Sequence, residues 1–183
     1  FTAVKVRWLA YRLPRWPLRV LDYGCGTGTL LKQWARERPD DARMGVDISP
    51  EMLWRARVGA SILTLLRTPK SALNYWSGTC NVVVLSGVLH HVKPSERAAV
   101  LSECCRLLKP GGELVIFEHN PRNPFVRWGV KHTAIDKNAV LLNDEEAAKA
   151  RLSMVNQELA RTGEEIRAAC DALALARGRE ESR

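Results

Sequence analysis

Two aspartates and three glycines near the start of the chain have the types and spacing needed to bind a charged nucleoside. Asp22 ends a short apolar run and is followed by glycines at alternate positions, Gly24, Gly26 and Gly28. Such glycines let the backbone approach a ligand because no Cβ is in the way. A helix that begins behind them offers free N–H groups. Asp47 ends a second apolar run about 20 residues further on, where an acid accepts hydrogen bonds from ribose hydroxyls.

The spacing of the glycines discriminates between nucleoside ligands. A dinucleotide fingerprint requires G-x-G-x-x-G, and Thr29 stands where its third glycine belongs, which argues against a nucleotide-dependent oxidoreductase. The carboxylate of Asp22 would repel a pyrophosphate and attract an ammonium group. A nucleoside with a cationic amino-acid tail and no phosphates fits these features, and S-adenosylmethionine is that molecule. A buried glycine turn beside two solvated aspartates is the simpler alternative. It does not explain why the glycine loop, the acid before it and the acid that ends the second strand occur together in register.

The elements that must hold these residues alternate between strands and helices. Strands are predicted at residues 19–24, 43–47, 62–66, 81–86 and 113–118. Helices are predicted at residues 1–13, 29–38 and 95–108, and a further helix begins with Ser49 as N-cap and Pro50 as its first residue. The strand runs are apolar throughout, as strands buried on both faces are. This alternation predicts βα units and an α/β fold with a parallel sheet.

Histidines follow two of the predicted strands. His90 and His91 come after the fourth strand, and His119 follows the fifth, next to Glu118. These strands should be neighbours, so we expect the three histidines to meet at the ligand edge of the sheet. His91 is our candidate for a general base toward an acceptor. The histidines could instead be ordinary polar residues at strand ends, and a metal site is the weakest alternative, so no metal is predicted.

The alternation of strands and helices ends after Asn120. Residues 109–112 predict a turn, and the Asn-Pro pairs at 120–121 and 123–124 predict a turn-rich loop. Arg122, Arg127 and Trp128 near this loop either contact an acidic or aromatic substrate or are surface residues. Residues 143–177 contain helix formers and no strand signal, which predicts two helices.

Composition limits the class of protein. The chain has 183 residues, one domain's worth, and its five cysteines are an odd number without a CxxC pair. This argues against a disulfide framework or structural zinc and for a reducing, cytoplasmic location. Neither a run of the roughly 18–20 apolar residues of a membrane span nor a secretory signal is visible. The first residue is Phe1 and not Met, so either residues are missing upstream or the chain is a fragment.

The net charge of +8 is unevenly spread, because residues 1–19 hold five basic residues and no acid. A basic arm of this kind could contact nucleic acid or, with Trp8 and Trp16, an anionic membrane surface. A solvated helix face is the simpler interpretation and the one we favour over both partners.

Four motifs in order resemble the class I methyltransferases, especially the small-molecule type 11 group that includes ubiquinone- and menaquinone-biosynthesis enzymes. They lie at residues 20–30, 45–53, 82–92 and 106–116, and the resemblance covers roughly residues 18–120. It implies a Rossmann-like three-layer sandwich with a mainly parallel sheet and a helical C-terminal extension. The implied parts are an N-terminal helix covering the cofactor site at 1–17, the cofactor-binding core at 18–120, and an acceptor-side loop with a helical tail at 121–183.

The resemblance also implies roles for single residues. Gly24, Gly26 and Gly28, with Cys25 among them, would line the methionine tail, and Asp22 would lie near its ammonium group.

Three further residues complete the implied cofactor site. Asp47 would hold the ribose, Ile48 would pack on the adenine, and Ser86 would sit under the methyl-bearing sulfur. The implied activity is methyl transfer from S-adenosylmethionine to a small, quinone-like or lipid acceptor. Ser86-Gly87 stands where DNA base-amino methyltransferases have an Asn-Pro-Pro-Tyr type of motif, which further disfavours a nucleic-acid substrate.

Departures from the family pattern support an alternative function. The family usually places an acid for the adenine amino group at a position that corresponds to Pro69, and residues 67–81 contain no acid. Residues 121–183 predict helices where the family expects an antiparallel strand pair. The alternative is therefore a non-catalytic or degenerate methyltransferase-like binding protein.

Overall fold

The fold is given by a computed structural model, which describes residues 2–57, 64–67, 77–133, 136, 139–143, 145–146, 148, 164 and 167. The helices are α1 (Thr2–Arg12), α2 (Thr29–Glu37), α3 (Pro50–Arg57), α4 (Pro94–Leu107) and α5 (Pro124–His132), with a short 3-10 turn, η2, at Leu89–His91. The strands are β1 (Arg19–Tyr23), β2 (Ala42–Asp47), β3 (Thr64–Arg67), β4 (Cys80–Ser86) and β5 (Leu108–Phe117).

The strands form one sheet in the order β3-β2-β1-β4-β5, and each neighbouring pair is parallel. The predicted α/β fold with a parallel sheet is therefore confirmed. The order reverses between β1 and β4, because the chain leaves β1 toward β2 and β3 and returns to the other side of β1. In open α/β sheets, ligands bind at this point, beyond the carboxyl ends of the strands.

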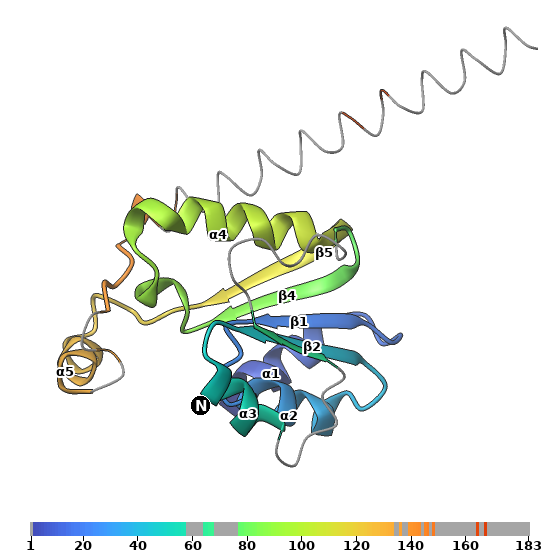
Figure 1. Cartoon of the computed structure of the whole chain (residues 1–183), viewed down its shortest axis with the longest axis horizontal. Helices are drawn as coiled ribbons and strands as arrows, with labels where there is room; N and C mark the ends of the chain where they lie inside the picture. The colour runs from blue at the N-terminus through green and yellow to red at the C-terminus, as the bar shows by residue number, and fades with distance from the viewer. Residues whose placement is uncertain are drawn as a thin grey trace, which may run out of the picture.

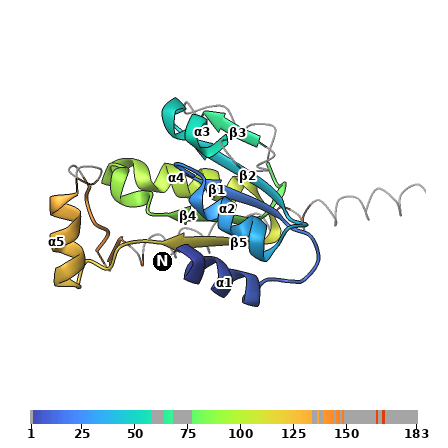
Figure 2. The same cartoon turned by 90° about the horizontal axis from the view of Figure 1, so that it is seen from below.

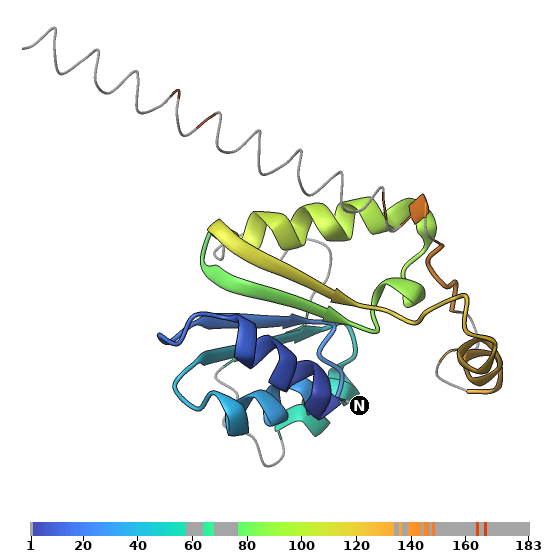
Figure 3. The same ribbon diagram turned by 180° about the vertical axis from the view of Figure 1, so that it is seen from behind.

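The sheet lies between two layers of helices, as Figures 1 and 3 show, with α4 on one side and α1, α2 and α3 on the other. Side chains along β4 alternate between these layers, so Val83 and Leu85 face the α4 side, whereas Val82 and Val84 face the side of α1 and α2. Both faces are covered, which explains why the strand sequences are apolar without alternation.

Helix α1 belongs to the core as well as to the surface. Val6 and Leu9 are 0% and 1% exposed and pack with Val82 and Val84 of β4. Figure 2 shows α1 running alongside β5, and the rings of Trp8 and Phe117 meet edge to face with centroids 6.1 Å apart. The N-terminal helix is thus held against the strands that flank the reversal of strand order.

Two parts of the fold differ from the sequence prediction. Residues 109–112, predicted as a turn, belong to β5, where Gly111 has φ +69° and the pairing register shifts between Cys80 and Val82. Because the register shift accommodates extra residues, β5 continues through a segment that would otherwise end a strand. Helix α5 lies beyond the carboxyl end of β5 (Figure 1), where only a loop was expected.

The start of α5 has clear local causes. The side chain of Asn123 accepts hydrogen bonds from Phe125 N and Val126 N, at 2.9 and 3.3 Å, and Pro124 occupies the first turn. Most of the two helices predicted for residues 143–177 lies outside the described residues. Among the helices that the structure describes, none has the length and apolar character needed to span a membrane.

Candidate functional site

The glycine loop joins β1 to α2 and is held by main-chain contacts to β2. Gly24 N and Cys25 N both donate to Val46 O, at 2.8 and 2.9 Å. Gly24 has φ +80°, and a Cβ built on it would lie 2.6 Å from Cγ2 of Val88, so the loop also packs against the segment after β4. A Cβ on Gly26, which has φ +53°, would meet nothing within 4 Å. The space beside Gly26 is therefore open to a ligand.

Asp47 is fixed by the loop that it faces. One carboxylate oxygen accepts a hydrogen bond from Gly26 N and the other accepts one from Ser49 N, both at 2.8 Å. Each oxygen keeps a second lone pair, so the carboxylate can still accept hydrogen bonds from two hydroxyl groups. The following residue, Ile48, is 75% exposed and presents an apolar surface beside this acid.

Asp22 is a carboxyl group in the middle of the sheet. It pairs in register with Gly45 of β2 and Val84 of β4, and it is 2% exposed. The pKa of Asp22 is raised to about 7, mainly by burial and further by the nearby Asp47, with Lys5 opposing the rise. A ligand that brings a positive charge to this carboxyl would favour its ionised form.

Cys25 contributes its backbone, and not its thiol, to the open side of the loop. The residue is 7% exposed, and a Cβ on Gly45 would lie 2.8 Å from its Sγ. The pKa of Cys25 is raised to about 12, mainly by burial and further by Asp22 and Asp47, so the thiol stays neutral. Its side chain therefore packs against β2.

Lys5 reaches the ligand edge from α1. Its Nζ donates to Ser86 Oγ at 2.9 Å and lies 5.0 Å from the ring centroid of Phe117. Burial lowers the pKa of Lys5, while Glu118 and Asp22 oppose the decrease. No local sequence pattern indicates this contact, because Lys5 and Ser86 are 81 positions apart.

Glu118 organises the turn after β4. Its Oε1 accepts hydrogen bonds from Val88 N and Leu89 N, at 2.9 and 2.7 Å, and its Oε2 lies 2.6 Å from Nδ1 of His90. Burial favours a raised pKa for Glu118, but the hydrogen bonds from His90 and from the two backbone groups outweigh it and hold the pKa below its ordinary value. The carboxylate therefore joins the end of β5 to η2.

The three predicted histidines do converge at this edge. The ring centroid of His90 lies 4.1 Å from that of His91 and 4.9 Å from that of His119. Burial lowers the pKa of His91, with His90 adding to the decrease and Asp136 opposing it, so a neutral imidazole is favoured there. The sequence prediction did not include Asp136, whose Oδ1 is 3.4 Å from Nε2 of both His90 and His91.

The residues predicted near the acceptor loop lie on or before α5 and are exposed. Trp128 is 65% exposed and stacks on His132 with ring centroids 4.6 Å apart, and Phe125 is 83% exposed. Arg122 and Arg127 are also on the surface.

The described residues fit S-adenosylmethionine on three counts. A buried carboxyl group at Asp22 suits a cationic tail, the space beside Gly26 admits a ligand, and Asp47 retains acceptors for a ribose. The position near Pro69, where the family's adenine-binding acid is expected, lies outside the described residues.

A family model described as a methyltransferase domain matches residues 20–112, slightly more than half of the chain, and the chain belongs to this family. The chain is 37% identical over 118 residues to a demethylmenaquinone methyltransferase from Symbiobacterium thermophilum, with 60% of this chain and 46% of that protein covered. It is 34% identical over 110 residues to a ubiquinone biosynthesis O-methyltransferase from Pectobacterium atrosepticum, covering 57% and 44%.

A solved methyltransferase structure has a similar fold. A SAM-dependent methyltransferase from Archaeoglobus fulgidus superposes with a TM-score of 0.66 at 21% identity, covering 84% of this chain and 66% of that one. The predicted Rossmann-like class and the resemblance to quinone-biosynthesis methyltransferases are confirmed, and S-adenosylmethionine is the cofactor that these comparisons support. The chain spans about half the length of the curated relatives it matches.

Proposed function

We propose that this chain binds S-adenosylmethionine at the carboxyl edge of β1, β2 and β4 and uses it to methylate a small molecule. The observation that carries the proposal is the buried Asp22 beside an open glycine loop whose backbone fixes Asp47. When bound, the cofactor supplies a methyl group on a positively charged sulfur for in-line displacement. The protein then has to position two molecules and exclude water.

Each residue of the site has a proposed task. Asp22 attracts the ammonium group of the methionine tail, and Asp47 accepts hydrogen bonds from the ribose. Ile48 packs on the adenine, and Ser86 lies near the sulfur. The tail itself runs along the loop formed by Gly24, Cys25, Gly26 and Gly28.

The three segments of the chain have separate proposed roles. Residues 1–17 cover the cofactor, residues 18–120 form the binding core, and residues 121–183 face the acceptor. The contact from Lys5 to Ser86 supports the first role, because it ties α1 to the ligand edge. The position of α5 beyond the end of β5 supports the last (Figure 1).

His91 is the proposed general base for an acceptor that loses a proton. Its lowered pKa favours the neutral imidazole that a base requires, and its side chain is 39% exposed, so an acceptor can reach it. No base is needed where the methylated product forms without the loss of a proton.

We propose an aromatic, quinone-like or lipid acceptor. Two relatives are named for menaquinone and ubiquinone biosynthesis, which supports this class. The exposed rings of Phe125 and Trp128 on α5 give an apolar surface on the acceptor side.

The proposal is tested by calorimetric titration of S-adenosylhomocysteine into the whole chain and into Asp47→Ala. We expect micromolar binding, weakened at least tenfold in the variant, because a hydrogen bond to a charged group contributes about 1.5–3 kcal/mol. Asp40→Ala is the matched control, since it removes an exposed acid that lies before the amino end of β2, away from Asp47, and should bind normally. Equal affinity in the wild type and Asp47→Ala would contradict the site.

A degenerate methyltransferase that no longer binds the cofactor productively is the second candidate. The absence of any acid from residues 67–81 favours it, because the adenine amino group then lacks its usual acceptor. A folded protein, with a cooperative thermal transition, that does not bind S-adenosylhomocysteine would support this candidate over the enzyme.

A further inference from the structure

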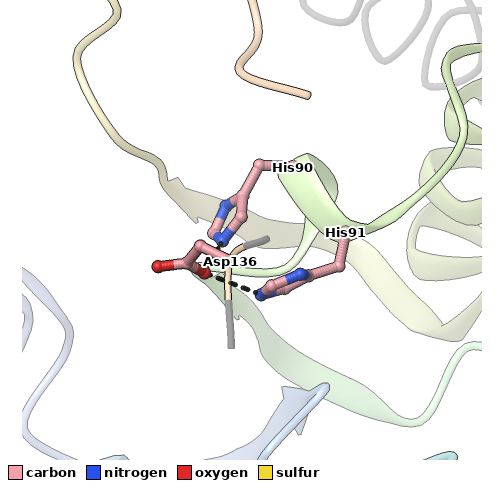
Figure 4. A group of neighbouring side chains, drawn as sticks. All are labelled: His90, His91 and Asp136. Atoms are coloured by element: carbon pink, nitrogen blue, oxygen red, sulfur yellow. Dashed lines mark ion pairs between the residues drawn. The ribbon is translucent and has the colours of Figure 1, made fainter. Parts of the chain in front are cut away.

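We propose that His90, His91 and Asp136 form a binding site for a divalent transition metal ion such as Zn²⁺, although the sequence alone predicted no metal. Figure 4 shows both imidazole rings of η2 with a nitrogen turned toward the carboxylate of Asp136, which comes from the segment after α5. One ligand atom from each residue can be chosen so that all three lie within 4.8 Å of one another. Two nitrogens and one carboxylate oxygen are a ligand set typical of Zn²⁺ and other first-row ions, and Mg²⁺ prefers oxygen alone.

The distances are close to those of a tetrahedral centre. Ligands about 2.05 Å from a zinc ion stand about 3.4 Å apart at tetrahedral angles. Oδ1 of Asp136 lies 3.4 Å from Nε2 of His90 and 3.4 Å from Nε2 of His91. Two of the three ligand pairs thus already have the required separation. The side chain of His91 is 39% exposed, which leaves it room to bring the two nitrogens together.

Glu118 orients His90 in the way that carboxylates orient metal-bound histidines. Its Oε2 lies 2.6 Å from Nδ1, so Nδ1 donates its proton to Glu118 and Nε2 presents a lone pair toward Asp136. Glu118 is itself held by two backbone N–H groups. A lone pair on Nε2 that faces a carboxylate oxygen at 3.4 Å is repulsive unless a positive charge lies between the two atoms. Either a proton on Nε2 or a metal ion supplies that charge, and titration with Zn²⁺ distinguishes them.

The segment that carries Asp136 is anchored independently of the histidine side chains. Val140 N donates to the backbone oxygen of His90 at 2.8 Å, and Ala139 N donates to Asp136 O at 2.8 Å. The buried Arg97 binds Leu89 O at 3.0 Å and also contacts Val140 O. The carboxylate therefore meets the histidines because the backbone holds it there, which is the preorganisation that a metal site requires.

Three protein ligands leave a fourth position open, as in catalytic zinc sites. This part of the inference rests on the proposed function, since an ion here would bind an oxygen of the methyl acceptor and ease the loss of its proton. His91 would then be a ligand, because one nitrogen lone pair cannot serve both a metal and a proton. The metal and the histidine base are thus exclusive roles for the same side chain.

The test is titration of the chelator-treated whole chain with Zn²⁺ by calorimetry and with Co²⁺ by visible absorption. We expect one equivalent to bind to the wild type and no such binding with Mg²⁺. His91→Ala and Asp136→Asn should each weaken binding more than 100-fold, and Glu118→Gln should weaken it about 10–100-fold, as loss of an orienting carboxylate does. His132→Ala, an exposed histidine of α5, is the matched control and should bind like the wild type.

Failure to bind Zn²⁺ or Co²⁺ would overturn the proposal. Binding that the three variants leave unchanged would also overturn it, because the ion would then be held by other groups, such as the cysteines. Circular dichroism checks that each variant is folded. Titration with S-adenosylhomocysteine in the same samples separates the two proposals, because the cofactor site uses none of these three ligands.

Discussion

Replacing Asp22 by asparagine should make the protein more stable at neutral pH, although it removes a residue of the proposed site. The rise of the Asp22 pKa from 3.8 to about 7 in the folded protein corresponds to about 4 kcal/mol of free energy. Well below pH 3.8 the carboxyl is protonated in both the folded and the unfolded states and contributes no difference. As the pH rises toward 7, the unfolded chain ionises first, so the folded state loses that free energy.

The assay is urea denaturation of the wild type and Asp22→Asn between about pH 4 and pH 8. Asparagine has the same shape and does not ionise, so the stability of the variant relative to the wild type should increase by up to about 4 kcal/mol across this range. Thermal melts should show a gain of roughly 10 °C, because 1 kcal/mol shifts the midpoint of a chain of this size by roughly 2–4 °C. Binding of S-adenosylhomocysteine should be lost in the variant.

Asp40→Asn is the control for the loss of one acid, because Asp40 is exposed and its replacement should give a difference independent of pH. If the difference between Asp22→Asn and the wild type were also constant from pH 4 to pH 8, burial would not be acting on Asp22 and the reasoning would be refuted.

Two further predictions concern the loop and its cover. Gly24→Ala should lower the free energy of unfolding by about 1–3 kcal/mol in urea, because its Cβ would lie 2.6 Å from Val88. Gly26→Ala should cost only about 1–2 kcal/mol of backbone strain but should abolish cofactor binding, and equal effects of both variants on binding would contradict the open space beside Gly26. Lys5→Met should tighten S-adenosylmethionine on the order of tenfold more than S-adenosylhomocysteine in calorimetry, since only the first carries a sulfonium charge near Lys5. A common change for both ligands would mean that Lys5 acts by shape alone.

The glycine loop and its strands were predictable from the sequence because each signal is local. Asp22, three alternating glycines and Asp47 lie within a short stretch, and apolar runs between helix signals define β1 and β2. The parallel direction of the strands followed from the alternation of strands and helices. These features depend on neighbours in the chain, so no tertiary information was needed.

The sequence contains a local signal for helix α5, but a turn pattern lies directly before it. Asn123 followed by Pro124 is a helix start, with a capping side chain and a proline that needs no N–H donor partner. The preceding Asn-Pro pair at 120–121 made the whole stretch resemble a loop. The two Asn-Pro pairs are typical of turns, but the cap formed by the Asn123 side chain determines the structure after residue 123.

The contacts of Lys5, Glu118 and Asp136 could not be predicted from local patterns. Each side chain meets partners from another element, as Lys5 meets Ser86 over 81 positions and Glu118 meets His90 over 28. Charged residues at such distances carry no periodic or spacing signal. Only the fold brings them together, which is why the sequence located the histidines but missed the carboxylate between them.

The packing of α1 also has a consequence for the order of folding. Helix α1 precedes every strand of the sheet in the chain, yet Val6 and Leu9 are buried with Val82 and Val84 of β4. The chain between α1 and β4 is long, so closing it costs conformational entropy. The contacts of α1 with β4 offset this cost only after β4 has joined β1. We therefore expect α1 to dock late in folding, after the central strands have paired. The ligand edge would then be completed only when the first segment of the chain returns to the sheet.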